Sequence, residues 1–175
     1  MKKNPPIIFI TGISCSGKST VYKYFKKNKK DCPSFDVRDI DEDSVPPAGR
    51  YHWKRFRMEL LLSEALKNKK KGKGTIICGI TIPFEVISSE LYSPKENIYF
   101  IILTISEKEF NKRMKARLKT LKEEWRWESV RESNKKLAPI LLNQAASLKN
   151  SYVINTEKFG EKEMIEKIKE VLISL

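Results

Sequence analysis

Eight residues near the start of the chain have the types and the spacing to bind phosphate. They read Gly12-Ile13-Ser14-Cys15-Ser16-Gly17-Lys18-Ser19, the pattern G-x-x-x-x-G-K-S. Backbone N–H groups of such a loop turn inward around phosphate oxygens, the lysine reaches the β- and γ-phosphates, and the serine hydroxyl can ligate Mg²⁺. We expect the phosphate contacts to come from Gly12, Ser14, Cys15, Ser16, Gly17, Lys18, Ser19 and Thr20. We also expect Lys18 to be exposed in an empty site.

The segments on both sides of this loop fit a phosphate site. Residues 7–10 are apolar, as in a buried parallel strand, and residues 21–25 can continue a helix. The N-terminus of a helix adds positive potential at bound phosphate. A strand, a glycine-containing loop and a helix in this order make a chance match improbable.

Carboxylates follow the second predicted strand. Asp39-Ile40-Asp41-Glu42-Asp43 places four acids in five residues of a basic chain. In an extended segment, side chains two apart point to the same side, so Asp39 and Asp41 can face one cleft. Such a carboxylate could take the proton of an acceptor hydroxyl, whereas a phosphate acceptor needs no base. The alternative is a solvated acidic loop.

Arginines supply the candidate anion-binding groups. Arg113 and Arg117 are four apart and share one helix face, unless this is simply a basic solvated helix. Arg57 shares the apolar side of its predicted helix, so its guanidinium can reach inward to a cleft. The alternative is an arginine that extends to the surface. Arg50 precedes the predicted helix of Arg57 and is a further candidate contact to the acceptor.

Strand and helix patterns alternate along the chain. We expect strands over residues 7–10, 34–38, 75–80, 97–104 and 151–155. We expect helices over residues 21–25, 53–68, 84–91, 106–118, 133–149 and 161–175. Ser106 and Glu109 have the spacing of a capping box. Unbroken apolar strands between helices predict an α/β domain, residues 1–175, with a parallel sheet of about five strands covered on both faces. Ligands then bind beyond the carboxyl ends of the strands.

The composition indicates one globular domain. Hydrophobic residues make up 40% and charged residues 33% of the 175 residues, and three cysteines have no metal-ligand spacing. We expect a cytoplasmic protein without a membrane span, because the apolar runs are short. The formal net charge is +13, which fits either a lysine-rich solvated surface or a nucleic-acid-binding face.

Together the loop, the acidic pair and the late arginine pair resemble the adenylate-kinase-like superfamily of small P-loop kinases. The resemblance implies a three-layer P-loop kinase fold with a small helical lid at about residues 117–132. It implies that Arg113 stacks on adenine, that Arg117 contacts phosphates, and that backbone near Asn155 and Thr156 lines the adenine pocket.

Asp39-x-Asp41 resembles the Asp-x-Asp of shikimate-kinase-like members. The resemblance implies that Asp39 lies near Mg²⁺ with Ser19, while Asp41 meets the acceptor hydroxyl. The third predicted strand ends Cys78-Gly79-Ile80-Thr81 without an acid. The metal-binding aspartate that many P-loop enzymes keep there is missing, which favours Asp39 for this role.

The sequence therefore predicts an ATP- and Mg²⁺-dependent kinase acting on a small hydroxyl compound, such as a nucleoside or a sugar acid. Lys18, Asp41, Arg113 and Arg117 are the predicted catalytic residues, and Asp41, Arg50 and Arg57 the predicted acceptor contacts. Three alternatives stay open: a nucleoside monophosphate kinase, an ATP-using nucleic-acid-binding protein such as a polynucleotide 5′-hydroxyl kinase, and a nucleotide-binding regulator without transfer activity.

Overall fold

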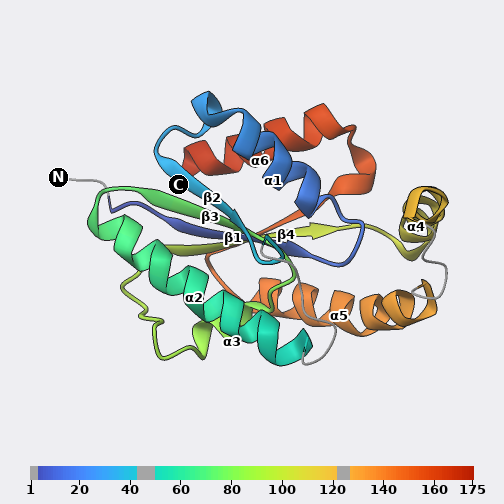
Figure 1. Ribbon diagram of the computed structural model, residues 1–175, viewed down its shortest axis with the longest axis horizontal. Helices are drawn as coiled ribbons and strands as arrows, with labels where there is room; N and C mark the ends of the chain where they lie inside the picture. Colours follow the sequence, from blue (N-terminus) through green and yellow to red (C-terminus); the bar gives the residue numbers. More distant parts are fainter. Residues whose placement is uncertain (1–3, 43–49, 122–126) are drawn as a thin grey trace.

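A five-stranded parallel sheet lies at the centre of the molecule (Figure 1). The computed structural model describes residues 4–42, 50–121 and 127–175. The strands lie in the order β2-β3-β1-β4-β5, and each neighbouring pair is parallel. They are β1 (Ile7–Gly12), β2 (Phe35–Asp39), β3 (Gly74–Cys78), β4 (Ile98–Thr104) and β5 (Ser151–Asn155).

Helices cover both faces of this sheet. Helices α1 and α6 pack on one face and α2, α3 and α5 on the other, while α4 lies near the carboxyl end of β4 (Figure 1). The helices are α1 (Lys18–Lys27), α2 (Arg50–Lys70), α3 (Pro83–Ile87), α4 (Glu107–Leu121), α5 (Trp127–Ser147) and α6 (Glu161–Ser174). Short 3₁₀ turns, η1 (Lys29–Asp31) and η3 (Thr156–Lys158), follow α1 and β5.

Strand β1 supplies both halves of the core because its side chains alternate between the two faces. Ile7 and Phe9 join the cluster under α2 and α5, whereas Ile8 and Ile10 join the cluster under α1 and α6. All four are fully buried. Phe9 also stacks on Phe100 of β4, with ring centroids 5.7 Å apart. This burial fixes β1, and with it the start of the loop that follows.

The strand order creates a crevice at the carboxyl end of β1. The chain leaves β1 for the edge strand β2, and it later crosses from β3 to β4 on the other side of β1. Connections that diverge from neighbouring strands leave an opening between them, where ligands of such folds bind. The loop after β1 lies at this opening.

The predicted fold class is confirmed, and most predicted elements lie within two or three residues of the observed ones. The third strand is shorter than predicted and ends at Cys78, because Gly79 adopts φ 145°, a conformation that side-chain-bearing residues rarely adopt. The short helix predicted over residues 84–91 ends at Ile87. Among the described residues, the three cysteines are free thiols, and no helix has the length and apolarity to cross a bilayer.

Candidate functional site

The loop between β1 and α1 winds tightly at the carboxyl edge of the sheet. Gly12 and Gly17 adopt φ values of 151° and 107°, and Cys15 adopts φ 63°. A Cβ on Gly12 would lie 2.2 Å from the backbone oxygen of Leu103, so this position requires glycine. Residues with positive φ let the amides of such a loop turn toward a bound anion, and a loop of this kind at the start of a helix is a typical anion-binding concavity.

A cavity of about 350 Å³ opens in front of this loop. Its described lining consists of Ser14, Cys15, Gly17, Lys18, Ser19, Thr20, Asp41, Lys54, Ile80, Arg113 and Arg117. The structure thus brings the loop, one carboxylate of the acidic run and both late arginines to the same cavity. Of the predicted site residues, Asp41, Arg113 and Arg117 come from elements far apart in the sequence.

Lys18 lies at the cavity wall but is not exposed as predicted. Only 9% of the residue is accessible, and Nζ donates to the backbone oxygen of Ile13 at 2.7 Å. The prediction was wrong because the lysine folds back onto its own loop. Burial and the neighbouring Lys54 lower the pKa of Lys18 to about 8, although Cys15, Asp39 and Asp41 act in the opposite direction.

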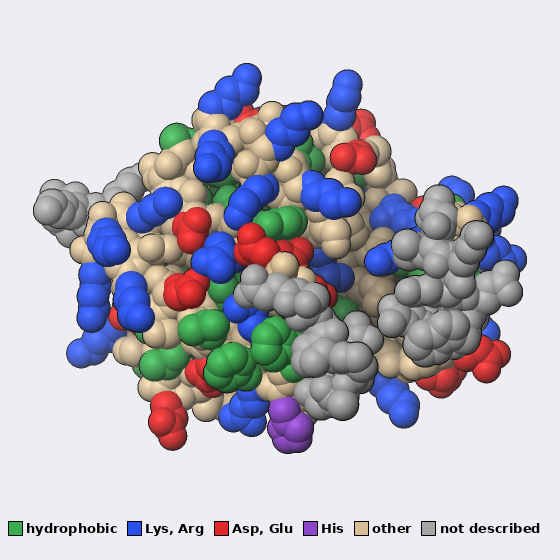
Figure 2. Space-filling view, in the orientation of Figure 1, with side chains coloured by type: hydrophobic (Ala, Val, Ile, Leu, Met, Phe, Trp, Pro, Cys, Tyr) green, Lys and Arg blue, Asp and Glu red, His purple; other side chains and the backbone are tan. Residues whose placement is uncertain are grey.

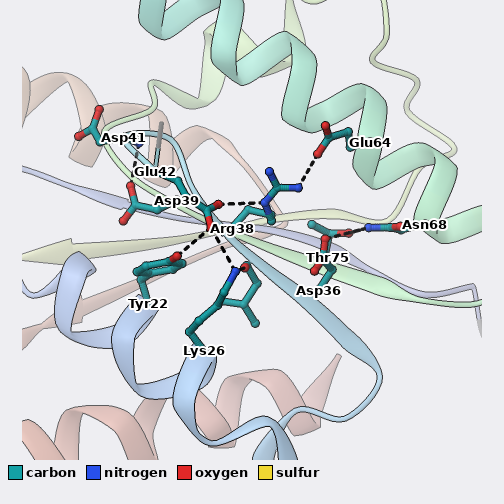
Figure 3. Close-up of polar contacts among 11 residues, drawn as sticks. Tyr22, Lys26, Asp36, Arg38, Asp39, Asp41, Glu42, Glu64, Asn68 and Thr75 are labelled. Atoms are coloured by element: carbon teal, nitrogen blue, oxygen red, sulfur yellow. Dashed lines mark hydrogen bonds and ion pairs between the residues drawn. The ribbon is translucent and has the colours of Figure 1, made fainter. Parts of the chain in front are cut away.

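The two aspartates lie at different depths. Asp39 is the last residue of β2, and its Oδ1 accepts a hydrogen bond of 2.8 Å from the Asp41 backbone N–H (Figure 3). Asp41 therefore lies in a turn and not in the extended segment we predicted. Burial raises the pKa of Asp39 above its ordinary value, while the hydrogen bond from Asp41 opposes this. Asp41 itself lines the cavity.

Glu42 anchors the acidic turn to two other elements. Its carboxylate accepts from the Tyr22 hydroxyl at 3.0 Å, from Lys26 Nζ at 3.2 Å and from Arg38 Nε at 3.0 Å (Figure 3). Arg38 also reaches Glu64 of α2 at 2.6 Å. Burial raises the pKa of Glu42, but these hydrogen bonds outweigh it and lower the pKa to about 2. The network holds the end of β2 between α1 and α2.

Lys54 is a cavity residue that the sequence prediction missed. It lies on α2, lines the cavity, and its Nζ is 3.9 Å from Asp41 Oδ1. No motif marks it, because only the packing of α2 beside the acidic turn brings it to the cavity.

Arg113 joins three parts of the site. Its NH1 donates to the Cys15 backbone oxygen at 3.2 Å, and its NH2 donates to the Thr156 backbone oxygen at 3.0 Å. Its Nε pairs with Glu109 Oε1 at 2.8 Å. This last contact corrects the predicted capping box: Ser106 Oγ does accept from the Glu109 N–H at 3.2 Å, but the Glu109 carboxylate orients Arg113 instead. The Ser106 N–H donates to Glu157.

Thr156 holds the turn after β5 against the phosphate loop. Its hydroxyl donates to the Ser16 backbone oxygen at 2.9 Å and accepts from Arg113 NH1 at 3.2 Å. The residue is 1% exposed. The predicted neighbours Arg113, Thr156 and the loop therefore do meet, and base binding between them stays a prediction.

Of the two arginines predicted to contact the acceptor, the structure describes the side chain of Arg57 and not that of Arg50. Arg57 points inward as predicted: it is 4% exposed, and its Cζ lies 5.9 Å from the centroid of the Trp53 ring. The described lining of the cavity does not include it. The side chain of Arg50 lies outside the described residues, as do Asp43 and residues 122–126 of the predicted lid.

Comparison with known proteins agrees with this architecture. A gluconokinase from Sinorhizobium meliloti 1021 superposes with a TM-score of 0.65 at 15% identity, covering 98% of this chain and 93% of that chain. A shikimate kinase from Aquifex aeolicus gives a TM-score of 0.56 at 14% identity, with 96% of both chains covered. A sugar kinase from Janibacter sp. HTCC2649 gives 0.54 at 13% identity, covering 94% and 92%.

These likenesses identify the fold as that of the small P-loop kinases, and the resemblance drawn from the sequence is confirmed. No curated protein matches the chain. Residues 8–136 match the family described as AAA domain. This range contains the phosphate loop, Asp41 and both arginines of the cavity. The chain is therefore a P-loop protein that belongs to the AAA domain family.

Proposed function

We propose that the protein is an ATP- and Mg²⁺-dependent phosphotransferase that moves the γ-phosphoryl group of ATP to a small hydroxyl acceptor, such as a nucleoside or a sugar acid. The observation that carries the proposal is one cavity lined by a phosphate loop, by Asp41 and by two arginines. These are the groups that phosphoryl transfer needs: donors for the phosphates, a carboxylate for the acceptor, and cations for the developing charge.

In the proposed reaction the phosphate loop and α1 hold the β- and γ-phosphates. When ATP binds, Lys18 Nζ gives up its hydrogen bond to the Ile13 backbone oxygen and donates to phosphate oxygens instead. Its charge then stabilises negative charge in the transition state. Arg117, on the exposed side of the cavity, neutralises the same charge. Arg113, fixed by Glu109 and Thr156, borders the nucleotide.

The donor set fits Mg²⁺. The Ser19 hydroxyl and the Asp39 carboxylate are the proposed ligands, and the described residues contain no cluster of three or more His, Cys, Asp or Glu that would hold a metal by itself. Magnesium in phosphoryl-transfer sites is bound by one or two protein groups together with phosphate oxygens and water. When bound, the ion would neutralise charge on the transferring phosphates.

Asp41 is the proposed base for the acceptor hydroxyl. It lines the cavity, and Lys54 Nζ lies 3.9 Å from its Oδ1. The acceptor hydroxyl would donate to this carboxylate while the oxygen attacks the γ-phosphorus in line with the leaving ADP.

The position of Lys54 also supports the second candidate, a nucleoside monophosphate kinase. A lysine beside Asp41 can bind an anionic group of the acceptor, and that group is a phosphate in a nucleotide or a carboxylate in a sugar acid. Neutral nucleosides would gain nothing from it. The nature of the preferred acceptor therefore separates the two candidates.

A screen of acceptors tests the proposal. Purified protein with ATP and Mg²⁺ is incubated with nucleosides, nucleoside monophosphates, sugars and sugar acids, while ADP formation and thermal stabilisation are followed. We expect ADP formation that depends on one acceptor class and is lost in Lys18→Ala. ADP formation that no acceptor increases would contradict the proposal.

A further inference from the structure

A partly buried hydrogen bond connects the phosphate loop with α5. The Ser14 N–H donates to Asn134 Oδ1 at 3.0 Å, across 120 positions of sequence. Ser14 lines the nucleotide cavity, and Asn134 is 5% exposed. One of the loop amides that we predicted to bind phosphate is thus already engaged by a side chain.

The other half of the Asn134 amide is unsatisfied. Nδ2 is buried and has no hydrogen-bond partner among the described residues. The amide cannot be turned over to relieve this, because Nδ2 would then face the Ser14 N–H, donor against donor. An apolar side chain would avoid this penalty, so the contact of Oδ1 with the loop is the feature that explains an asparagine here.

A second cavity, of about 250 Å³, lies beside Asn134. Its lining includes Ile13 of the phosphate loop, Phe110 of α4, and Arg131 and Asn134 of α5. The hydrogen bond from Ser14 therefore links α5 to the loop beside this cavity.

We propose that Asn134 is a positioning residue that couples nucleotide binding at the phosphate loop to the N-terminal half of α5. The inference rests on the proposed function, since it requires that the loop binds ATP. Asn134 holds the first turn of the loop in its binding shape while the amides of the following residues bind phosphate. The ordered loop in turn holds the N-terminal half of α5.

Two variants and a matched control test the coupling. Asn134→Leu keeps the branched shape of the side chain, at a larger volume, and removes the acceptor. Asn134→Asp keeps an acceptor oxygen, and Asn143→Leu makes the same replacement as the first variant at an exposed asparagine of α5. The probe is the non-hydrolysable analogue AMP-PNP with Mg²⁺. Its Kd is measured by calorimetry, and hydrogen exchange is followed in peptides that cover residues 127–137.

We expect AMP-PNP to protect residues 127–137 in the wild type and in Asn143→Leu. In Asn134→Leu the protection is lost and the Kd rises about two- to tenfold, the worth of one net hydrogen bond. Asn134→Asp restores the protection, even though its negative charge weakens phosphate binding. A role in packing alone would not distinguish the Leu and Asp variants in this way.

Two outcomes overturn the inference. Unchanged protection and Kd in Asn134→Leu, or a loss of protection in Asn134→Asp equal to that in the Leu variant, would show that Asn134 does not couple the loop to α5. A wild-type protein that fails to bind AMP-PNP would contradict the proposed function, and the coupling with it.

Discussion

At the scale of single residues, the burial of Lys18 means that its substitution should lower both the catalytic rate and the stability of the fold. Lys18→Ala removes transition-state charge stabilisation, so we expect kcat to fall by about 10²–10³-fold, the typical cost of one such donor. The bond to Ile13 is also lost, which lowers the free energy of unfolding by about 1 kcal/mol. Steady-state rates and urea unfolding measure the two effects. The exposed Lys23→Ala on α1 is the control, and near wild-type turnover in Lys18→Ala would contradict the proposed role.

The two aspartates should respond differently to removal of charge. Asp41→Asn loses general-base assistance, so we expect kcat to fall by about 10²–10⁴-fold with little change in the KM for ATP. Asp39→Asn should instead raise the Mg²⁺ concentration needed for half-maximal rate. Titrations of ATP and Mg²⁺ with each variant measure these effects.

One combination of results would show that Asp41 does not act as a general base. If Asp41→Asn keeps its kcat while Lys54→Met abolishes saturation by the acceptor, the acceptor is held by charge and needs no base. A phosphate-bearing acceptor, and therefore a nucleotide kinase, would then be the better assignment.

At the scale of elements, Glu42 makes stability depend on pH. Its pKa of about 2 lies below the ordinary 4.5, so the unfolded state binds more protons between these values, and stability rises with pH across this window. The contribution is fully present above about pH 4.5 and is lost as the pH falls toward 2. The side chain is 26% exposed, so we expect about 1 kcal/mol after screening.

Urea unfolding of wild type and Glu42→Gln checks this. We expect the variant to be less stable by about 1 kcal/mol at pH 7 and the difference to shrink steadily below pH 4.5. A difference that does not change between pH 7 and pH 3 would mean that the ion pairs and hydrogen bonds around Glu42 do not stabilise β2.

The elements themselves were largely predictable, because apolar strands and amphipathic helices leave local patterns. Residues 151–155 were predicted with their observed bounds, and the loop motif identified the phosphate site. Long-range packing could not be predicted. Lys54 and Asn134 carry no motif, and they reach the site only because α2 and α5 pack beside it. The hydrogen bond from Lys18 to the Ile13 backbone oxygen likewise depends on the geometry of the loop, which the residue types do not determine.

At the scale of the whole molecule, the net charge of +13 fits either a solvated surface or a nucleic-acid-binding face. Figure 2 shows lysine and arginine side chains spread over the visible face with acidic side chains between them. On this face, such a distribution fits a solvated surface better than a single track for a nucleic-acid backbone.

Binding of oligonucleotides at two salt concentrations tests this distinction. For a small-molecule kinase we expect weak binding and no phosphorylation of a 5′-hydroxyl oligonucleotide at either concentration. A polynucleotide kinase would bind tightly at low salt and lose affinity steeply, since each phosphate contact releases counterions. Fluorescence anisotropy and end-labelling assays would show which behaviour holds.

The central claim is that the cavity transfers a phosphoryl group rather than merely binding or hydrolysing ATP. The most direct measurement uses ATP labelled with ¹⁸O in the γ-phosphoryl group, together with the acceptor identified by the screen, and follows the label by mass spectrometry. The account predicts that the label appears on the acceptor in step with ADP formation, and that both products form about 10²–10³-fold more slowly in Lys18→Ala. Label recovered only as inorganic phosphate, or ATP that stays intact with every acceptor, would contradict it.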